Sequence, residues 1–187
     1  RENEVRRLQP EMIKAAVMLQ KEYDVIPIVG QAGNLPDSLY AELMPERSDV
    51  GLLKGDSHRL MQHSYAAMAA SGTATLELGF LQTPIVVLYT VSPLTYWLGR
   101  MLIKVNAISL ANIVLGQKAV PELIQKDMTA ENIAEELKKY LTDESYYSSV
   151  VEKLSGIRPA LGGSGAAEKA ATSVLGFLNG EIPSLRE

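Results

Sequence analysis

The stretch YAAMAASGTATLELGFLQTPIVVLYTVSP, residues 65–93, decides the fold of this chain. It opens with an apolar run of strand length, Tyr65–Ala70, and ends in a second run, Ile85–Tyr89, made of β-branched and large apolar residues. A helix-compatible segment, 74–80, lies between them, and a turn at 82–84 separates it from the second run. Strand, small-residue turn, helix and strand predict one βαβ unit with its crossover.

The turn between the first strand and the helix is the candidate ligand site. Gly72 lets the backbone approach a ligand, and Ser71, Thr73 and Thr75 place hydroxyls and amides at the helix start. Unpaired N–H groups and partial positive charge at a helix N-terminus favour a phosphate. Glu77, about one helical turn on, is placed to accept hydrogen bonds from a ribose diol. The same residues also fit ordinary helix capping, so their spacing leaves both interpretations open.

Composition excludes several classes of function. A net charge of −4 argues against general nucleic-acid binding, which needs a basic face. The chain has no cysteine, so it forms neither a disulfide nor a thiolate metal site. His58 and His63 are its two histidines, so we expect no histidine-rich metal site and assign them surface or local packing roles. No apolar run reaches the about 18 residues that suggest a membrane span.

Hydrophobic spacing predicts the remaining elements. Helices are expected over residues 4–23, 37–44, 57–63, 93–104, 129–141, 143–157 and 165–178, and strands over 25–29, 50–53 and part of 106–115. Pro10 is expected to begin the main part of the first helix, because proline loses no needed hydrogen bond in a first turn. Ser57 is expected to cap the helix over 57–63, and Thr129 with Asn132 the helix that follows.

This alternation of strands and helices predicts an α/β fold with a doubly wound, mostly parallel sheet covered on both faces. We expect the helices over residues 143–187 to pack on the sheet rather than to form a second domain. The chain begins at Arg1 with neither an initiator Met nor a signal-peptide pattern, so we expect it to be part of a longer protein.

The residues alone indicate a Rossmann-like domain with a candidate anion site. No nucleophile elbow, Walker loop or GxGxxG motif is present. Tyr96 and Trp97 lie beside Arg100 and Lys104 and would suit a lipid-facing patch, although an aromatic stripe on a helix more often belongs to a core.

Longer segments resemble a known family. These are ASGTATLE (70–77), TPIVVLY (83–89), VSPLTYW (91–97), ISLAN (108–112), VPELIQ (120–125) and GGSGAAEKAA (162–171). In order and spacing they closely resemble the C-terminal half of lipid-A-disaccharide synthase. The resemblance covers nearly all 187 residues, and SGTATLE with SPLTYW is not a generic Rossmann pattern.

The resemblance implies a GT-B glycosyltransferase, in which two Rossmann-like domains face each other across a cleft. Residues 1–187 would be the UDP-sugar-binding C-terminal domain, and the N-terminal acceptor domain would lie outside this chain. Such an enzyme moves 2,3-diacylglucosamine from UDP to 2,3-diacylglucosamine 1-phosphate and inverts the anomeric carbon. It releases UDP and forms lipid A disaccharide 1-phosphate, without a metal or other cofactor. The general base would lie on the N-terminal half, so this chain alone would bind UDP weakly and transfer nothing.

The resemblance also implies a place in the cell. The substrates are diacylated, so the full-length enzyme would be cytoplasmic and peripheral on the inner membrane of a Gram-negative-type bacterium. Membrane contact would involve the segment 94–103, and a homodimer would form through the C-terminal helices. No nucleic acid is expected as a partner.

The implied roles can be assigned residue by residue. Ser71, Gly72, Thr73 and Thr75 match the loop and helix start that face the diphosphate, and Glu77 matches the position that takes the ribose hydroxyls.

Further positions match elsewhere. Lys54 and Gly55 lie where related enzymes turn backbone groups to the uracil edge. Asn112 matches a functional, catalytic Asn of the family, and Glu122 and Gln125 match its ELxQ segment near the donor.

Arg1 matches the Arg of the family's GSR loop, because EVRRLQP follows as it does there. In that position it would act in catalysis by neutralising charge on the leaving diphosphate. The chain also departs from the family: Thr90 and Gln117 stand where cations are usual, and Ala111 replaces a Pro. These departures bear on phosphate contacts and acceptor choice.

Two alternatives stay open. Another UDP-sugar enzyme of the same fold, such as a hexosamine transferase or a non-hydrolysing epimerase, would use UDP-N-acetylglucosamine rather than its diacylated form. A non-catalytic nucleotide-binding or scaffold domain is the other, and the departures at Thr90 and Gln117 leave room for it.

Overall fold

The computed structural model describes residues 1–45, 49–91, 107–162 and 165–179. Its helices are α1 (Glu2–Gln20), α2 (Asp37–Leu43), α3 (Ser57–His63), α4 (Thr73–Phe80), α6 (Leu110–Leu115), α7 (Ala130–Thr142), α8 (Glu144–Ser155), α9 (Ile157–Ala160) and α10 (Ala166–Leu178), with a 3-10 turn, η1 (Gln125–Asp127). Its strands are β1 (Ile28–Gln31), β2 (Gly51–Lys54), β3 (Ala67–Ala70), β4 (Ile85–Tyr89) and β5 (Glu122–Ile124). The helix expected over 93–104, with its aromatic and membrane-contact segment, lies outside the described residues.

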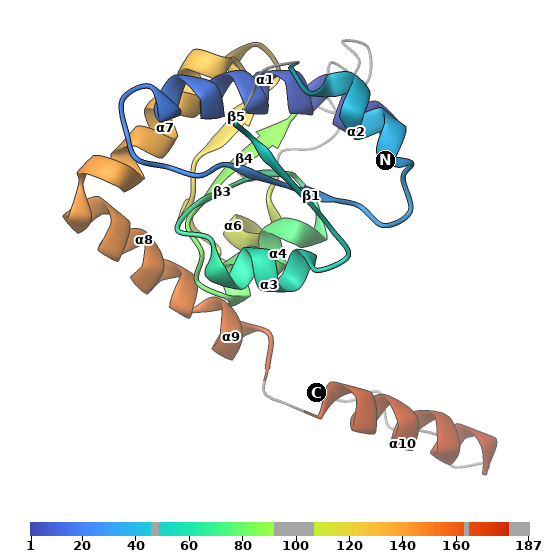
Figure 1. Ribbon diagram of the computed structural model, residues 1–187. Coiled ribbons are helices and arrows are strands. Elements are labelled where there is room, and N and C mark those ends of the chain that lie inside the picture. Colours follow the sequence, from blue (N-terminus) through green and yellow to red (C-terminus); the bar gives the residue numbers. More distant parts are fainter. Residues whose placement is uncertain (46–48, 92–106, 163–164, 180–187) are drawn as a thin grey trace.

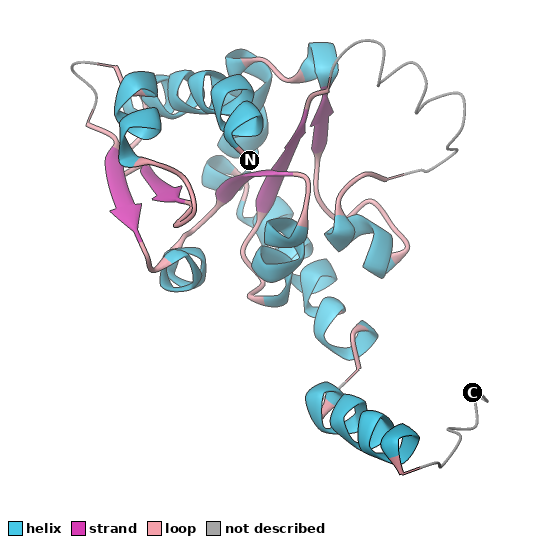
Figure 2. Ribbon diagram, turned by 90° about the vertical axis from the view of Figure 1, so that its right-hand side faces the viewer, coloured by secondary structure: helices cyan, strands magenta, loops and turns pink. Residues whose placement is uncertain are grey.

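The strands pair in two groups, and every described pair is parallel. β1 pairs with β2, and β3, β4 and β5 lie side by side in that order. Figure 2 shows the β1–β2 pair to one side of the other three strands. The α/β class with parallel strands is therefore confirmed. The single sheet that we expected is two separate ladders within the described residues.

Helices cover both faces of the three-stranded group. α1 and α7 lie on one side, and α4 and α6 lie on the other (Figure 1). β4 runs through the middle of the core, where the side chains of residues 85–88 are at most 1% exposed. A central parallel strand that is apolar on both faces is what such covering produces.

Three sequence expectations are wrong. α1 runs without a break through Pro10, because buried Leu8 and Ile13 on either side of the proline hold one continuous helix against the core. The segment 107–115 contains no strand: Ser109 caps α6, and the fifth strand is β5, further along the chain. Ser57 is the first residue of α3 rather than its cap.

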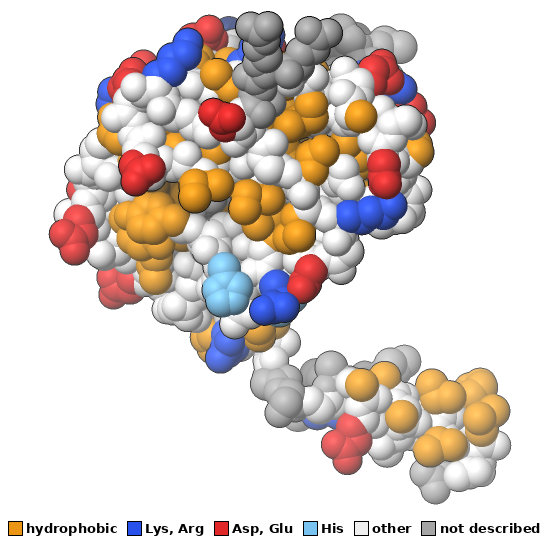
Figure 3. All heavy atoms as spheres, viewed as in Figure 1, with side chains coloured by type: hydrophobic (Ala, Val, Ile, Leu, Met, Phe, Trp, Pro, Cys, Tyr) orange, Lys and Arg blue, Asp and Glu red, His pale blue; other side chains and the backbone are white. Residues whose placement is uncertain are grey.

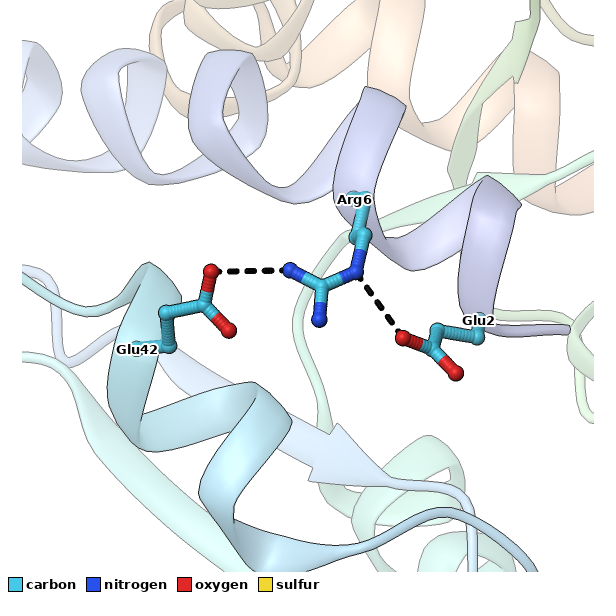
Figure 4. Close-up of polar contacts among 3 residues, drawn as sticks. All are labelled: Glu2, Arg6 and Glu42. Carbon is cyan, nitrogen blue, oxygen red and sulfur yellow. Dashed lines mark hydrogen bonds and ion pairs between the residues drawn. The ribbon is translucent and has the colours of Figure 1, made fainter.

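Charged side chains attach α1 to its neighbours. Arg6 lies between Glu2 and Glu42, with Nε 2.9 Å from Glu2 Oε1 and Nη1 2.9 Å from Glu42 Oε1 (Figure 4). The Glu42 and Glu2 hydrogen bonds raise the pKa of the Arg6 guanidinium. The contact with Glu42 joins α1 to α2.

The start of α7 is capped from two directions. Thr129 Oγ1 accepts a hydrogen bond from Asn132 N at 3.3 Å, which confirms Thr129 as the cap. The Asn132 side chain instead donates to Asp127 O at 2.9 Å, so only half of the expected capping pattern forms. Glu11 Oε2, on α1, accepts from Ala130 N at 3.0 Å. This last bond ties α1 to α7.

The C-terminal helices differ in their packing. α8 and α9 pack on the body through buried Val150, Leu154 and Ile157. α10, which we expected to pack there too, stands away from the body in Figure 1 and leaves its apolar side chains exposed at its far end in Figure 3. Phe177 and Leu178 are both 73% exposed. In the described part of the chain, no helix has the length and apolarity to span a membrane.

Candidate functional site

The candidate site lies at the carboxyl edge of the three-stranded group. Ser71 follows β3, Val91 follows β4 and Gln125 follows β5, so these residues all lie at the ends of parallel strands. Ligands of open α/β sheets bind outside this edge. Hydrogen bonds link Ser71, Asn112 and Glu122 here through the start of α6.

The start of α4 offers open backbone donors. Gly72 is the N-cap, and among the described residues no side chain caps the helix and no atom beyond its chain neighbours lies within 4 Å of where a Gly72 Cβ would be. The N–H groups of Thr73 and Ala74 have no intrahelical acceptor by their position. The ordinary capping that we left open as an alternative is therefore not what the structure shows. The backbone at Gly72 is extended, a conformation that any residue adopts. The glycine matters here because its lack of a side chain leaves space beside the turn.

Thr75 does not face a ligand. Its side chain is fully buried, and Oγ1 donates to Gly72 O at 2.7 Å. This hydroxyl holds the turn, so the structure gives no support to the expected contact of Thr75 with the diphosphate. Thr73 is exposed, and the role expected of it stays a prediction.

Ser71 is also held within the chain. Its Oγ donates to Ile108 O at 2.9 Å, and its N–H donates to Leu88 O at 2.9 Å. A hydroxyl has one proton, so Ser71 Oγ can only accept from any further partner. Since diphosphate oxygens are acceptors, the donors left for them are backbone N–H groups and the Thr73 hydroxyl.

Glu122 is surrounded by donors from the chain itself. Its Oε1 accepts from Ser109 N at 2.9 Å, Ser109 Oγ at 2.8 Å and Asn112 Nδ2 at 2.8 Å. Its Oε2 accepts from Ile108 N at 2.9 Å. Three donors saturate Oε1, while Oε2 accepts one donor and has a lone pair left. Most of the carboxylate is thus used within the chain, and direct substrate binding by Glu122 stays a prediction from the sequence.

Asn112 is buried, with 1% of its surface exposed. Its Nδ2 donates to Val120 O at 2.9 Å as well as to Glu122, and its Oδ1 accepts from Ala119 N at 2.8 Å and Val120 N at 3.0 Å. These bonds use both N–H groups and both lone pairs of the amide. In this structure Asn112 joins α6 to the start of β5, and its expected catalytic contact with substrate stays a prediction.

Gln125 pairs with the backbone of Val91. Its Oε1 accepts from Val91 N at 2.7 Å, and its Nε2 donates to Val91 O at 3.1 Å. The pair lies beyond Tyr89 and Ile124, where the β4–β5 ladder ends. Gln125 has a φ of 54°, a left-handed conformation that costs a non-glycine residue energy. Its amide therefore fixes the end of β4, and the expected contact of Gln125 with the donor stays a prediction.

The other expected residues lie on the surface. Glu77 is exposed on α4, and its carboxylate has no hydrogen-bond or ion-pair partner among the described residues. Lys54 Nζ pairs with Asp37 Oδ1 at 2.7 Å, and Gly55 has a φ of 90° with open space beside it. Arg1 is exposed, and its amino group lies 3.5 Å from Glu4 Oε2. No interaction found among the described residues joins Arg1 to the start of α4.

Ile108, Ser109 and Val91 belong to the site but were not expected there. The sequence signal for Ser109 is its place three residues before Asn112, because Ser is a strong N-cap and its Oγ accepts from Asn112 N at 3.2 Å. Ile108 and Val91 take part through backbone groups alone, so residue type gives no signal for them. Within the described ranges, no three His, Asp or Glu side chains gather as a metal would require.

Comparison with known proteins gives a family match. The model of the lipid-A-disaccharide synthetase family matches residues 1–163. The chain is 40% identical over 180 residues to a lipid-A-disaccharide synthase of Myxococcus xanthus (strain DK1622), covering 95% of this chain and 47% of that protein. It is 36% identical over 184 residues to the one of Geobacter sulfurreducens, covering 97% and 48%. The chain thus spans about half the length of these curated relatives.

A solved structure gives the fold independently. The crystal structure of a UDP-N-acetylglucosamine 2-epimerase matches with a TM-score of 0.55 at 19% identity, over 96% of this chain and 43% of that one. At this identity the match shows the shared fold alone.

Proposed function

This chain belongs to the lipid-A-disaccharide synthase family, and from that membership we propose that it is the UDP-sugar-binding half of a glycosyltransferase of lipid A biosynthesis. Its matched residues, 1–163, include every described helix and strand from α1 to α9. One observation supports a donor site at the start of α4: among the described residues the backbone donors beside Gly72 are open, and the unpaired carboxylate of Glu77 lies about one turn on.

In the proposed reaction, 2,3-diacylglucosamine passes from UDP to 2,3-diacylglucosamine 1-phosphate. The acceptor 6-hydroxyl attacks the anomeric carbon and loses its proton to a general base. The bond from that carbon to the diphosphate oxygen breaks, UDP departs with the electron pair, and the β-1′,6 bond forms with inversion. We place the base on the half of the relatives that this chain does not span. The chain would thus bind UDP weakly by itself and transfer nothing.

This chain stabilises the leaving group in the proposal. The N–H groups of Thr73 and Ala74 and the Thr73 hydroxyl donate to the diphosphate, where developing charge is favoured by a helix N-terminus. Glu77 accepts from the ribose hydroxyls. Backbone groups of Lys54 and Gly55 meet the uracil edge, and Arg1 neutralises the departing diphosphate in place of a metal.

The setting of the reaction follows from its substrates. Both are diacylated, so the full-length enzyme would work as a peripheral protein at the cytoplasmic face of the inner membrane. A homodimer through the C-terminal helices is also proposed. It is supported by the exposed apolar side chains of α10, among them Val174, Phe177 and Leu178.

The test is a transfer assay with two donors. We expect full-length protein to form disaccharide from UDP-2,3-diacylglucosamine and not from UDP-N-acetylglucosamine, and residues 1–187 alone to form none. If the full-length protein turned over UDP-N-acetylglucosamine instead of UDP-2,3-diacylglucosamine, the result would favour a different UDP-sugar enzyme of the same fold. Disaccharide formed by residues 1–187 alone would contradict the proposal that the general base lies outside this chain.

A further inference from the structure

We propose that Glu122 and Gln125 are positioning residues that together clamp the carboxyl edge of the sheet, and that Glu122 acts through Ile108 on the Ser71 loop, residues 71–73. The step from the clamp to donor binding rests on the function proposed above. The clamp itself rests only on hydrogen bonds among described residues.

One arm of the clamp holds the end of β4. Both backbone groups of Val91 are bonded to the Gln125 side chain, at 2.7 and 3.1 Å. An amide that accepts and donates in this way reproduces the pairing of a neighbouring strand. Gln125 thus extends the β4–β5 contact beyond Tyr89 and Ile124, where the backbone ladder stops.

The other arm holds the start of α6. Glu122 accepts from the N–H of Ile108 at 2.9 Å and from the N–H of Ser109 at 2.9 Å. Val91 and Ile108 lie on either side of residues 92–106 in the chain, so two side chains three positions apart hold the backbone on both sides of that stretch.

The peptide group between Ile108 and Ser109 connects Glu122 to the Ser71 loop. The C=O of Ile108 accepts from Ser71 Oγ at 2.9 Å, while the N–H of the same peptide, that of Ser109, donates to Glu122 Oε1. Hydrogen bonds in such a line polarise and strengthen one another. Glu122 therefore orients the Ser71 loop without touching what the loop binds.

The two arms predict different consequences. Replacement of one Glu122 oxygen by a donor frees the N–H of Ile108 or Ser109 and disturbs the Ser71 loop. Loss of the Gln125 amide frees Val91 and leaves that loop in place. A change that only destabilised the fold would instead affect all these amides together with the core of β4.

Amide hydrogen exchange on residues 1–187 tests the clamp. Glu122→Gln replaces one acceptor oxygen by an NH2 group, so we expect exchange at Ile108 or Ser109, whichever N–H faces the NH2, to rise at least about tenfold with Val91 unchanged. Gln125→Met should raise exchange at Val91 by a similar factor and spare Ile108. The N–H of Val87, bonded to Pro121 O at 2.9 Å, reports on the core in both variants. Glu135→Gln, an exposed change on α7, is the matched control.

UDP titration of the same variants tests the link to the donor. Glu122→Gln should weaken UDP binding more than Gln125→Met, and Ser71→Ala should weaken it while leaving exchange at Ile108 N unchanged. Ser71→Ala also tests the link if Glu122→Gln fails to fold. Unchanged exchange at Ile108 and Ser109 in Glu122→Gln, or an equal rise at Val87, would overturn the clamp. Absence of UDP binding by the unaltered chain would count against the proposed function, and the exchange result would still decide the clamp.

Discussion

Glu11 on α1 caps the start of α7, because its Oε2 accepts a hydrogen bond from Ala130 N at 3.0 Å across 119 positions of sequence. Its Oε1 also accepts from Lys14 Nζ at 2.6 Å. The Lys14 hydrogen bond is the main cause of a lowered pKa for the Glu11 carboxyl, and the Ala130 N–H adds to it. One carboxylate thus joins two helices that lie on the same face of the sheet.

Glu11→Ala is expected to lower the free energy of unfolding by about 1 kcal/mol, the usual value of a helix cap. The pKa of this carboxyl is lower in the folded state than its ordinary value of 4.5, so the ionised carboxylate stabilises the fold at pH values above 4.5. That contribution is lost as the pH falls through the lower folded pKa. Urea unfolding at pH 7 and pH 3 should therefore show the loss at pH 7 and a smaller one at pH 3. An equal difference at the two pH values would contradict this account.

Gly79→Ala is expected to destabilise the chain by about 1–3 kcal/mol, the usual cost of overpacking. A Cβ at this position would collide with Ile157 Cδ1 and touch Leu154, because α4 passes close to α9 there. Ile157→Val removes the colliding methyl, so the double variant should recover part of the loss in thermal unfolding. Gly33→Ala, which has nothing within 4 Å of its new Cβ, is the control. If the stability losses of Gly79→Ala and Ile157→Val simply add in the double variant, the proposed collision between the two side chains is wrong.

Asn112→Ala is expected to cost about 2–4 kcal/mol of stability, since each buried group left unpaired costs about 1–3 kcal/mol. The substitution leaves Ala119 N and Val120 N without their acceptor. Chemical denaturation measures the change, with the exposed Asn34→Ala as control. A variant as stable as the parent but inactive in the full-length protein would instead support the catalytic role expected of Asn112 from the sequence.

The proposed dimer predicts a surface effect on α10. Leu175→Glu with Leu178→Glu should shift the full-length protein from dimer toward monomer, because charges on these exposed side chains prevent their burial against another surface. Sedimentation velocity measures the shift. Lys169→Glu, on the same helix, should leave the association state unchanged. A parent protein that sediments as a monomer at all concentrations would exclude the dimer.

The central βαβ unit was predictable because its signals are local. β4 has the bounds expected for it, since five consecutive large apolar residues leave no alternative to a buried strand. α4 begins one residue before the expected start. The family was likewise predictable from motifs such as ASGTATLE, and the match over residues 1–163 confirms it.

What could not be predicted depends on contacts between distant segments. β5 has three residues and begins with Glu122, so it has neither the length nor the apolar pattern of a strand. The carboxylate of Glu122 looks free in the sequence, and only the fold brings Ile108 and Ser109 to it. Thr75 was assigned to a ligand for the same reason, because a polar residue type does not show whether its hydroxyl turns back to the chain.

Titration of UDP into residues 1–187 by calorimetry, with ADP as the control ligand, tests the central claim most directly. We expect weak UDP binding that ADP does not match. Glu77→Ala should weaken it at least about tenfold, the effect of one lost hydrogen bond to a charged group. Glu131→Ala, an exposed change in the first turn of α7, should leave it unaltered. Binding that ADP equals, or that Glu77→Ala leaves unchanged, would contradict a UDP-sugar site at the start of α4.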